Sequence, residues 1–170
     1  MVAVDPPASV GASADHCGIV AAGAWGEGWR RTAMVLADAS VQGAAPNKWA
    51  QAAASLARSL GAHAIVAEAN NGGEMVRAVL QAAAPDIYVR LVRASEGKRA
   101  RAEPIAAFYA QGRVKHAAAF PALEDELCGL IVGGSYEGPG RSPDRADALV
   151  WAVTELMLGK KREGPRIRLL

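Results

Sequence analysis

The chain has 170 residues, of which 51% are hydrophobic and 5% aromatic, and a formal net charge of +2. This length is typical of one domain with a full core, and the alanine-rich composition indicates close-packed helices. No apolar run is long enough to span a membrane and no signal sequence opens the chain, which argues against a membrane protein. Cys17 and Cys128 lie far apart and have no Cys-x-x-Cys partner, which argues against a disulfide scaffold. The sequence therefore indicates a reduced, cytosolic protein.

The first quarter of the chain predicts three strands followed by a helix. Residues 1–5 form a short strand with little lead-in, as if cut from a longer chain, and the prolines after it cannot continue a central ladder. Residues 17–25 and 31–38 are apolar and joined by a short glycine turn, which predicts an antiparallel hairpin. Pro46 then begins a helix that ends at Gly61.

The middle of the chain alternates strands and helices. Residues 63–68 are an apolar run that ends in a carboxylate and a glycine-rich turn, which is typical of a buried parallel strand. A helix over 74–84 and a strand over 87–92 follow, and the resulting βαβ crossover joins both strands to the strand over 1–5. We therefore expect an α/β fold, a mixed sheet of about five strands with an antiparallel hairpin and helices on both faces.

Shorter elements follow. Residues 93–104 are a basic segment, which predicts a loop, and residues 105–111 continue it as a helix. Residues 112–116 predict a short strand and residues 120–127 a helix of a turn or two. Residues 133–140 form a glycine-rich loop that we expect to be mobile.

The last regular element is a helix over 143–158. Pro143 at its first position, Ser142 as candidate cap, and Asp144 and Asp147 in its first turn all predict this start. Residues 159–170 carry a charge of +4 against −2 for the rest and have no apolar periodicity. We expect one domain over 1–158 and a basic, flexible tail over 159–170; this charge distribution allows an anionic partner without requiring one.

Four carboxylates stand at the ends of these elements. Asp5 and Glu68 end strands whose carboxyl ends share one sheet edge, and Asp144 and Asp147 lie three residues apart on one helix face. Converging carboxylates repel each other and are best neutralised by Mg²⁺ or Mn²⁺. Two such ions, about 3.5–4 Å apart, can clamp the attacking and leaving oxygens of a phosphoryl transfer. A structural role stays open, because strand-end and helix-start carboxylates are common as caps; Asp38 ends a strand in the same way.

The remaining reactive or aromatic side chains favour packing. The cysteines and the three histidines lack the spacing of a zinc site, and Cys128 is expected in the core. Trp25, Trp49 and Trp151 lie in apolar periodic segments, whereas Trp29 lies at a turn and is expected to be exposed.

Six stretches stand in an order typical of one family. They are residues 4–7, 18–23, 66–73, 97–104, 120–127 and 142–152. Over residues 4–158 they resemble the C-terminal nuclease domain of the large terminase subunit of tailed bacteriophages and gene transfer agents. The last two stretches are the most specific.

This resemblance implies an RNase H-like fold and an endonuclease site with two Mg²⁺ or Mn²⁺ ions. Asp5 matches the metal ligand of the first strand, Glu68 the second acidic ligand, and Asp147 the ligand on the final helix. Asp144 stands where relatives carry an auxiliary acidic or histidine residue.

The resemblance also implies a DNA substrate. Lys98, Arg99 and Arg101 match the basic motif of the family, which could neutralise phosphates; without the resemblance they predict a solvated basic loop. Residues 133–140 could close over the duplex or form a plain surface hairpin, and the basic tail could be a second phosphate contact or a solubilising end.

The family's role gives the expected function. We expect the domain to cut concatemeric double-stranded DNA with low sequence specificity during genome packaging, in the cytoplasm of the bacterial host. Its partners are an N-terminal ATPase domain, the small terminase subunit and the portal. The chain has no Gly-x-x-x-x-Gly-Lys-Ser/Thr loop, so the motor activity is not expected of it. Two alternatives are another RNase H-like nuclease, such as a Holliday-junction resolvase, and a non-catalytic DNA-binding or docking module.

Overall fold

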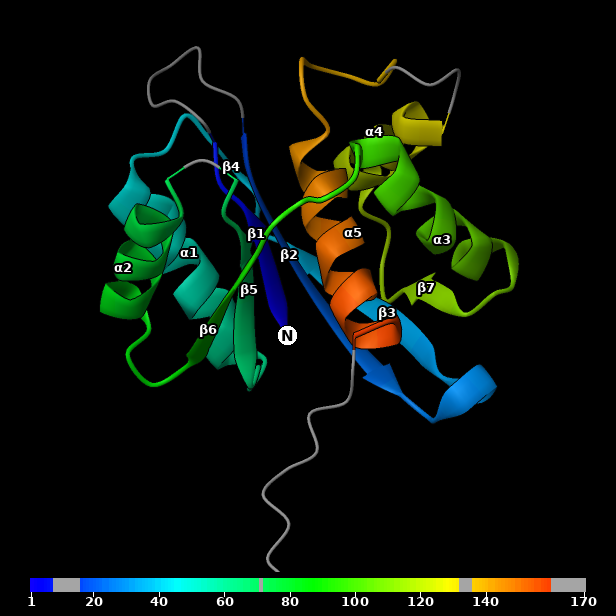
Figure 1. Ribbon diagram of the computed structural model, residues 1–170, viewed down its shortest axis with the longest axis horizontal. Helices are drawn as coiled ribbons and strands as arrows, with labels where there is room; N and C mark the ends of the chain where they lie inside the picture. Colours follow the sequence, from blue (N-terminus) through cyan, green and yellow to red (C-terminus); the bar gives the residue numbers. More distant parts are fainter. Residues whose placement is uncertain (8–15, 71, 132–135, 160–170) are drawn as a thin grey trace, which may run out of the picture.

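A mixed sheet forms the centre of the computed structural model, which describes residues 1–7, 16–70, 72–131 and 136–159 (Figure 1). Its strands are β1 (Val2–Asp5), β2 (His16–Trp25), β3 (Thr32–Asp38), β4 (Val41–Gln42), β5 (Ala64–Glu68), β6 (Tyr88–Val92) and β7 (Val114–His116). Their order is β6-β5-β1-β2-β3-β7, with β4 paired to β2. The sheet therefore has seven strands rather than about five, because the short β4 and β7 extend it.

The pairing pattern confirms the predicted hairpin and the predicted crossover. β2 pairs antiparallel with β1 and β3, whereas β5 lies parallel between β1 and β6. β1 and β5 are buried on both faces, which explains why their sequences are continuous apolar runs rather than alternating ones.

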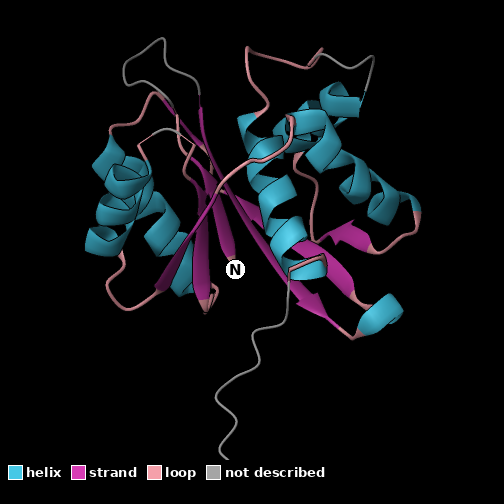
Figure 2. Ribbon diagram, in the orientation of Figure 1, coloured by secondary structure: helices cyan, strands magenta, loops and turns pink. Residues whose placement is uncertain are grey.

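Helices cover both faces of the sheet, as predicted (Figure 2). They are α1 (Pro46–Ser59), α2 (Gly73–Ala83), α3 (Lys98–Ala110), α4 (Pro121–Ile131) and α5 (Asp144–Met157), with a short 3₁₀ turn, η1 (Gly28–Arg30). Val2 and Val4 belong to the core with α1 and α2, while Ala3 packs on the opposite face with α5. In the part of the chain that the structure describes, no helix is both long and apolar enough to cross a membrane.

The basic segment is helical, which corrects the prediction of a loop before residue 105. α3 begins at Lys98 and contains Pro104, so six helical residues come before the proline. A basic first turn opposes the helix dipole, and an interior proline removes a backbone donor. Contacts of Lys98 and Arg101 with carboxylates on other elements hold this turn, and such contacts do not show in local sequence.

Three smaller expectations are also corrected. α4 runs to Ile131 rather than to residue 127, because Leu123 and Leu130 continue its buried face. Cys128 of α4 is exposed rather than part of the core. Trp25, which was expected to pack, is 54% exposed at the end of β2. Trp29 is exposed, as expected. The expectations for residues 132–135 of the glycine-rich loop and for 160–170 of the tail lie outside the described residues.

The start of α5 is capped by another helix. Pro143 is its N-cap and makes no side-chain cap hydrogen bond, so Ser142 does not have the predicted role. Instead the buried Glu126 of α4 accepts hydrogen bonds from the backbone N–H groups of Arg145 and Ala146, at 2.8 and 3.2 Å, and from Arg145 Nη1 at 2.8 Å. The carboxylate thus satisfies backbone donors that α5 cannot satisfy itself.

Close contact between α5 and β2 depends on a glycine. A β-carbon at Gly18 would lie 1.9 Å from the carbonyl oxygen of Asp144, which no side chain could tolerate. Gly18 is also the pairing partner of Asp5. The absence of a side chain there brings the first turn of α5 down beside the end of β1.

We predict that Glu126→Ala lowers the free energy of unfolding by about 2 kcal/mol, because two backbone donors and Arg145 Nη1 lose their acceptor. Glu126→Gln keeps one acceptor oxygen and should cost less. Urea denaturation measures both. Asp125→Ala changes an exposed neighbour on α4 and should stay within about 0.5 kcal/mol of the parent; an equal loss in the two alanine variants would contradict the capping role.

Candidate active site

Neighbouring parallel strands place Asp5 beside Glu68. The register pairs Val4 with Ala67, and each carboxylate follows one residue later. Side chains alternate along a strand, and Ala3 and Val66, two residues earlier, both pack on the face that carries α5. Asp5 and Glu68 therefore belong to the α5 face of the sheet, at the carboxyl ends of their strands.

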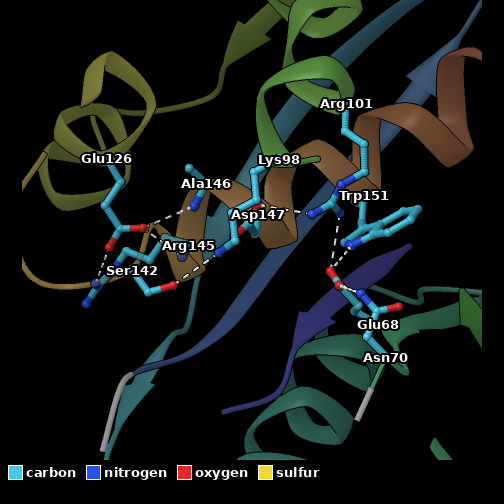
Figure 3. Close-up of polar contacts among 10 residues, drawn as sticks. All are labelled: Glu68, Asn70, Lys98, Arg101, Glu126, Ser142, Arg145, Ala146, Asp147 and Trp151. Atoms are coloured by element: carbon cyan, nitrogen blue, oxygen red, sulfur yellow. Dashed lines mark hydrogen bonds and ion pairs between the residues drawn. The ribbon is translucent and has the colours of Figure 1, made fainter. Parts of the chain in front are cut away.

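Glu68 is held by three donors (Figure 3). Its Oε1 accepts from Asn70 Nδ2 at 2.5 Å. Its Oε2 accepts from the indole Nε1 of Trp151 at 2.5 Å and from Arg101 Nη1 at 3.2 Å. Both oxygens are therefore engaged by donors from three different elements of the fold.

Asp147 is paired with two cations. Its Oδ2 accepts a short hydrogen bond from the Lys98 ammonium, and its Oδ1 lies 3.6 Å from Arg101 Nη2. Lys98 also donates to the Ser142 hydroxyl at 3.1 Å. Arg101 thus bridges Asp147 and Glu68, and α3 supplies both positive charges of the site.

The surroundings of Asp5 and Asp147 favour their neutral forms. Loss of hydration raises the pKa of Asp5 well above its usual value, and the charges of Asp147, Glu68 and Asp144 raise it further. Burial also raises the pKa of Asp147, and Lys98 and Arg101 offset only part of that rise. Asp144 is itself buried in the first turn of α5.

The charge of Lys98 is stabilised in turn. Burial works against its ammonium form, but Asp147 and the other carboxylates outweigh that effect and raise its pKa. Lys98 therefore stays positive as a counter-charge for the carboxylates.

The structure places the four carboxylates within electrostatic reach of one another but not in a closed ligand set. Across residues 1–7, 16–70, 72–131 and 136–159, no three His, Cys, Asp or Glu side chains converge tightly enough to hold a metal ion. Lys98 and Arg101 lie against the carboxylates instead. Carboxylate oxygens are the donors that Mg²⁺ and Mn²⁺ prefer, so the chemistry of the donor set and its need for positive charge fit a hard divalent cation.

The three basic residues differ in exposure. Arg99 is exposed and the Lys98 side chain is 46% exposed, whereas the Arg101 side chain is 10% exposed. Arg99 and Lys98 are therefore open to solvent. Arg101 is committed to the carboxylates and to the face of Trp151, which its guanidinium carbon approaches to 4.7 Å from the ring centroid.

Sequence reasoning missed four residues that build this site. Trp151 was expected only to pack, yet it stands four residues after Asp147 and so shares its helix face. Asn70 follows Glu68 by two residues, a spacing at which an amide can reach a neighbouring carboxylate. Gly18 and Glu126 act through contacts between distant elements, for which the sequence carries no local signal.

Comparison with known proteins identifies a sequence family and a similar fold. The sequence model described as Terminase RNaseH-like domain matches residues 2–156. The crystal structure of the large terminase nuclease from thermophilic phage G20c superposes with a TM-score of 0.65 at 15% identity, over 91% of this chain and 80% of that chain. The search of curated proteins finds no match.

Two further structures superpose less closely. RuvC from Thermus thermophilus gives a TM-score of 0.49 at 17% identity, over 91% of this chain and 92% of that chain. The nuclease domain of the large terminase subunit of bacterial virus Sf6, solved with manganese, gives a TM-score of 0.39 at 20% identity, over 85% of this chain and 60% of that chain.

We predict that the metal-free domain loses stability as the pH rises. A carboxyl group whose pKa is raised in the folded state keeps its proton at pH values where the unfolded chain has lost it. The stability that Asp5 and Asp147 contribute in this way is complete below their unfolded pKa values of about 4. It is lost as the pH rises through their raised folded-state pKa values. Asp5→Asn should flatten this slope and raise the free energy of unfolding near neutral pH by on the order of 1 kcal/mol.

Urea denaturation in chelator, repeated from acidic to mildly alkaline pH, measures the slope. Asp86→Asn is the matched control, because Asp86 is exposed and its hydrogen bond with Arg58 lowers its pKa. This substitution should therefore change the stability only at acidic pH. A slope that persists unchanged in Asp5→Asn would show that Asp5 titrates normally.

Proposed function

Because the chain belongs to the terminase RNase H-like domain family, and so is a nuclease domain of that fold, we propose that it is a Mg²⁺- or Mn²⁺-dependent endonuclease that hydrolyses double-stranded DNA. The observation that supports this proposal is that Asp5, Glu68 and Asp147 lie within electrostatic reach of one another and beside the cations of α3. Such a gathering costs free energy for folding, which favours a role in function over one in stability.

The carboxylates would hold the metal. Asp5, Glu68 and Asp147 are the proposed ligands, and Asp144 assists from the first turn of α5. Two such ions would activate the attacking water and stabilise the departing 3′ oxygen of a phosphodiester.

The residues around the carboxylates prepare the site for a polyanion. Lys98 has a raised pKa and remains protonated, and its half-exposed side chain lies between Asp147 and the solvent. An ammonium in this place can exchange a carboxylate partner for a phosphate oxygen when DNA arrives. Arg101 stays behind it and limits the repulsion between Glu68 and Asp147.

The biological setting that we propose is genome packaging. Cuts in concatemeric DNA would begin and end the loading of a procapsid in the cytoplasm of the bacterial host. The near-neutral body and the lack of a base-reading motif favour low sequence specificity. Targeting would then come from the ATPase domain, the small terminase subunit and the portal.

We predict that the purified chain linearises plasmid DNA with Mn²⁺ or Mg²⁺ and not with chelator. Asp5→Ala and Asp147→Ala should each reduce the rate by at least about a hundredfold, because each removes a ligand that no neighbour replaces. Gel electrophoresis of timed reactions measures the loss.

Asp86→Ala is the control for this assay, since it removes an exposed carboxylate that pairs with Arg58 away from the site. Cleavage that survives both ligand substitutions would contradict the assigned site. Preferential cutting of branched over linear DNA would instead favour a junction resolvase, and metal-independent DNA binding without any cutting would favour a docking module.

We also predict that Arg99 contacts a phosphate. Arg99→Ala should weaken DNA binding and reduce the slope of log affinity against log salt by about one, because one phosphate contact releases about 0.9 counterions. Fluorescence anisotropy in chelator measures the slope. Lys48→Ala removes an exposed positive charge from α1, on the opposite face of the sheet, and should leave the slope unchanged.

A further inference from the structure

The carboxylate of Glu68 is fixed from two sides at once. Asn70 donates to Oε1, and Trp151 donates to Oε2, each at 2.5 Å (Figure 3). The two donors come from different segments, the turn after β5 and the helix α5. A carboxylate with a separate donor on each oxygen cannot rotate about its last bond without losing a hydrogen bond.

Trp151 is itself held rigidly. Its side chain is buried in the cluster that contains Ala3 and Val66, the residues two positions before the strand-end carboxylates. The Arg101 guanidinium covers its ring. The indole therefore has a defined position relative to β1 and β5, and its N–H edge points to Glu68.

The helix that carries Trp151 also carries Asp147. The two residues are four positions apart, so they lie one turn apart on one face of α5. Asp147 is a proposed ligand, and Trp151 sets the orientation of another, Glu68. α5 thereby fixes the relation between a carboxylate of its own and a carboxylate of the sheet.

Asn70 is held on the opposite side. Its Oδ1 accepts a hydrogen bond from the backbone N–H of Ala94 at 3.0 Å, which orients the amide so that Nδ2 points to Glu68. Ala94 lies just beyond the end of β6, the strand next to β5. The amide is therefore tied to the sheet on both of its polar atoms.

We propose that Trp151 and Asn70 are positioning residues that hold the Glu68 carboxylate in one orientation for metal binding. The proposal rests on the proposed function. Among the described residues, Oε1 of Glu68 accepts only the Asn70 bond and keeps a second lone pair, so the two donors orient the carboxylate without excluding a cation. Partners that orient a metal ligand typically contribute tenfold or more to metal affinity.

The test replaces the indole with a ring of similar character. Trp151→Phe keeps an aromatic face for Arg101 and an apolar side chain for the core but removes the N–H donor. Trp49→Phe is the matched control, because Trp49 belongs to α1 and is buried on the other face of the sheet. Asn70→Ala removes the second donor from an exposed position, where loss of a side chain does not disturb the core.

The first readout is independent of cleavage. In ¹H–¹⁵N spectra the indole resonance that disappears in Trp151→Phe is assigned to Trp151. We expect this resonance to shift when Glu68→Ala removes its acceptor, while the Trp49 resonance stays in place. An unmoved Trp151 resonance would overturn the proposal.

The second readout is Mn²⁺ affinity by calorimetry. We expect the dissociation constant to rise about tenfold in Trp151→Phe and in Asn70→Ala, and to stay unchanged in Trp49→Phe. In cleavage assays kcat should fall while KM for DNA does not change, since a buried indole does not touch the substrate. Wild-type Mn²⁺ affinity in both site variants would overturn the proposal, and Asn70→Ala decides it if Trp151→Phe fails to fold.

Failure of the proposed function gives a different result. A parent chain that binds no Mn²⁺ and cuts no DNA would refute the nuclease assignment and the metal role of Glu68 together. If the parent binds Mn²⁺ and the site variants bind it equally well, only the positioning role is refuted.

Discussion

Repulsion among buried and half-buried carboxylates is the constraint on which the rest of the structure depends. Asp5 and Glu68 end adjacent parallel strands, and α5 brings Asp147 to the same place. Where its members are ionised, such a group requires compensating positive charge, and Lys98 and Arg101 provide that charge. This requirement explains a start of α3 that local propensity disfavours, with basic residues in the first turn and a proline further on.

α5 converts this constraint into a defined geometry. Gly18 lets its first turn approach β2, and Glu126 supplies the acceptor for its first backbone donors. Because α5 is buried on nearly all sides, it cannot slide or rotate without losing these contacts. A rigid helix of this kind can place Asp147 and Trp151 against side chains of the sheet with the precision that a metal site requires.

The sequence predicted the parts of the fold that follow local rules. Apolar runs that end in a carboxylate identified β1 and β5, and Pro143 with its acidic first turn identified α5. The RNase H-like class followed from the order of short motifs and is confirmed by the family match and the superposition. The missed features, namely the early start of α3, the Glu126 cap and the Trp151 donor, all depend on contacts between residues far apart in the chain. Periodicity marks a buried tryptophan but does not show which carboxylate its N–H will meet.

The residues of the site divide into two physical classes. Asp5 and Asp147 are destabilised by their surroundings, because burial and neighbouring charge raise their pKa values. Glu126 and Gly18, by contrast, stabilise the scaffold around them. The residues of the first class are the proposed metal ligands, and those of the second class support the fold, so the sign of the stability change on substitution should separate proposed ligands from supports. Glu68 is a proposed ligand whose orientation depends on Trp151 and Asn70. The position of Glu68 between the sheet and α5 is therefore the point at which folding and the proposed chemistry are coupled.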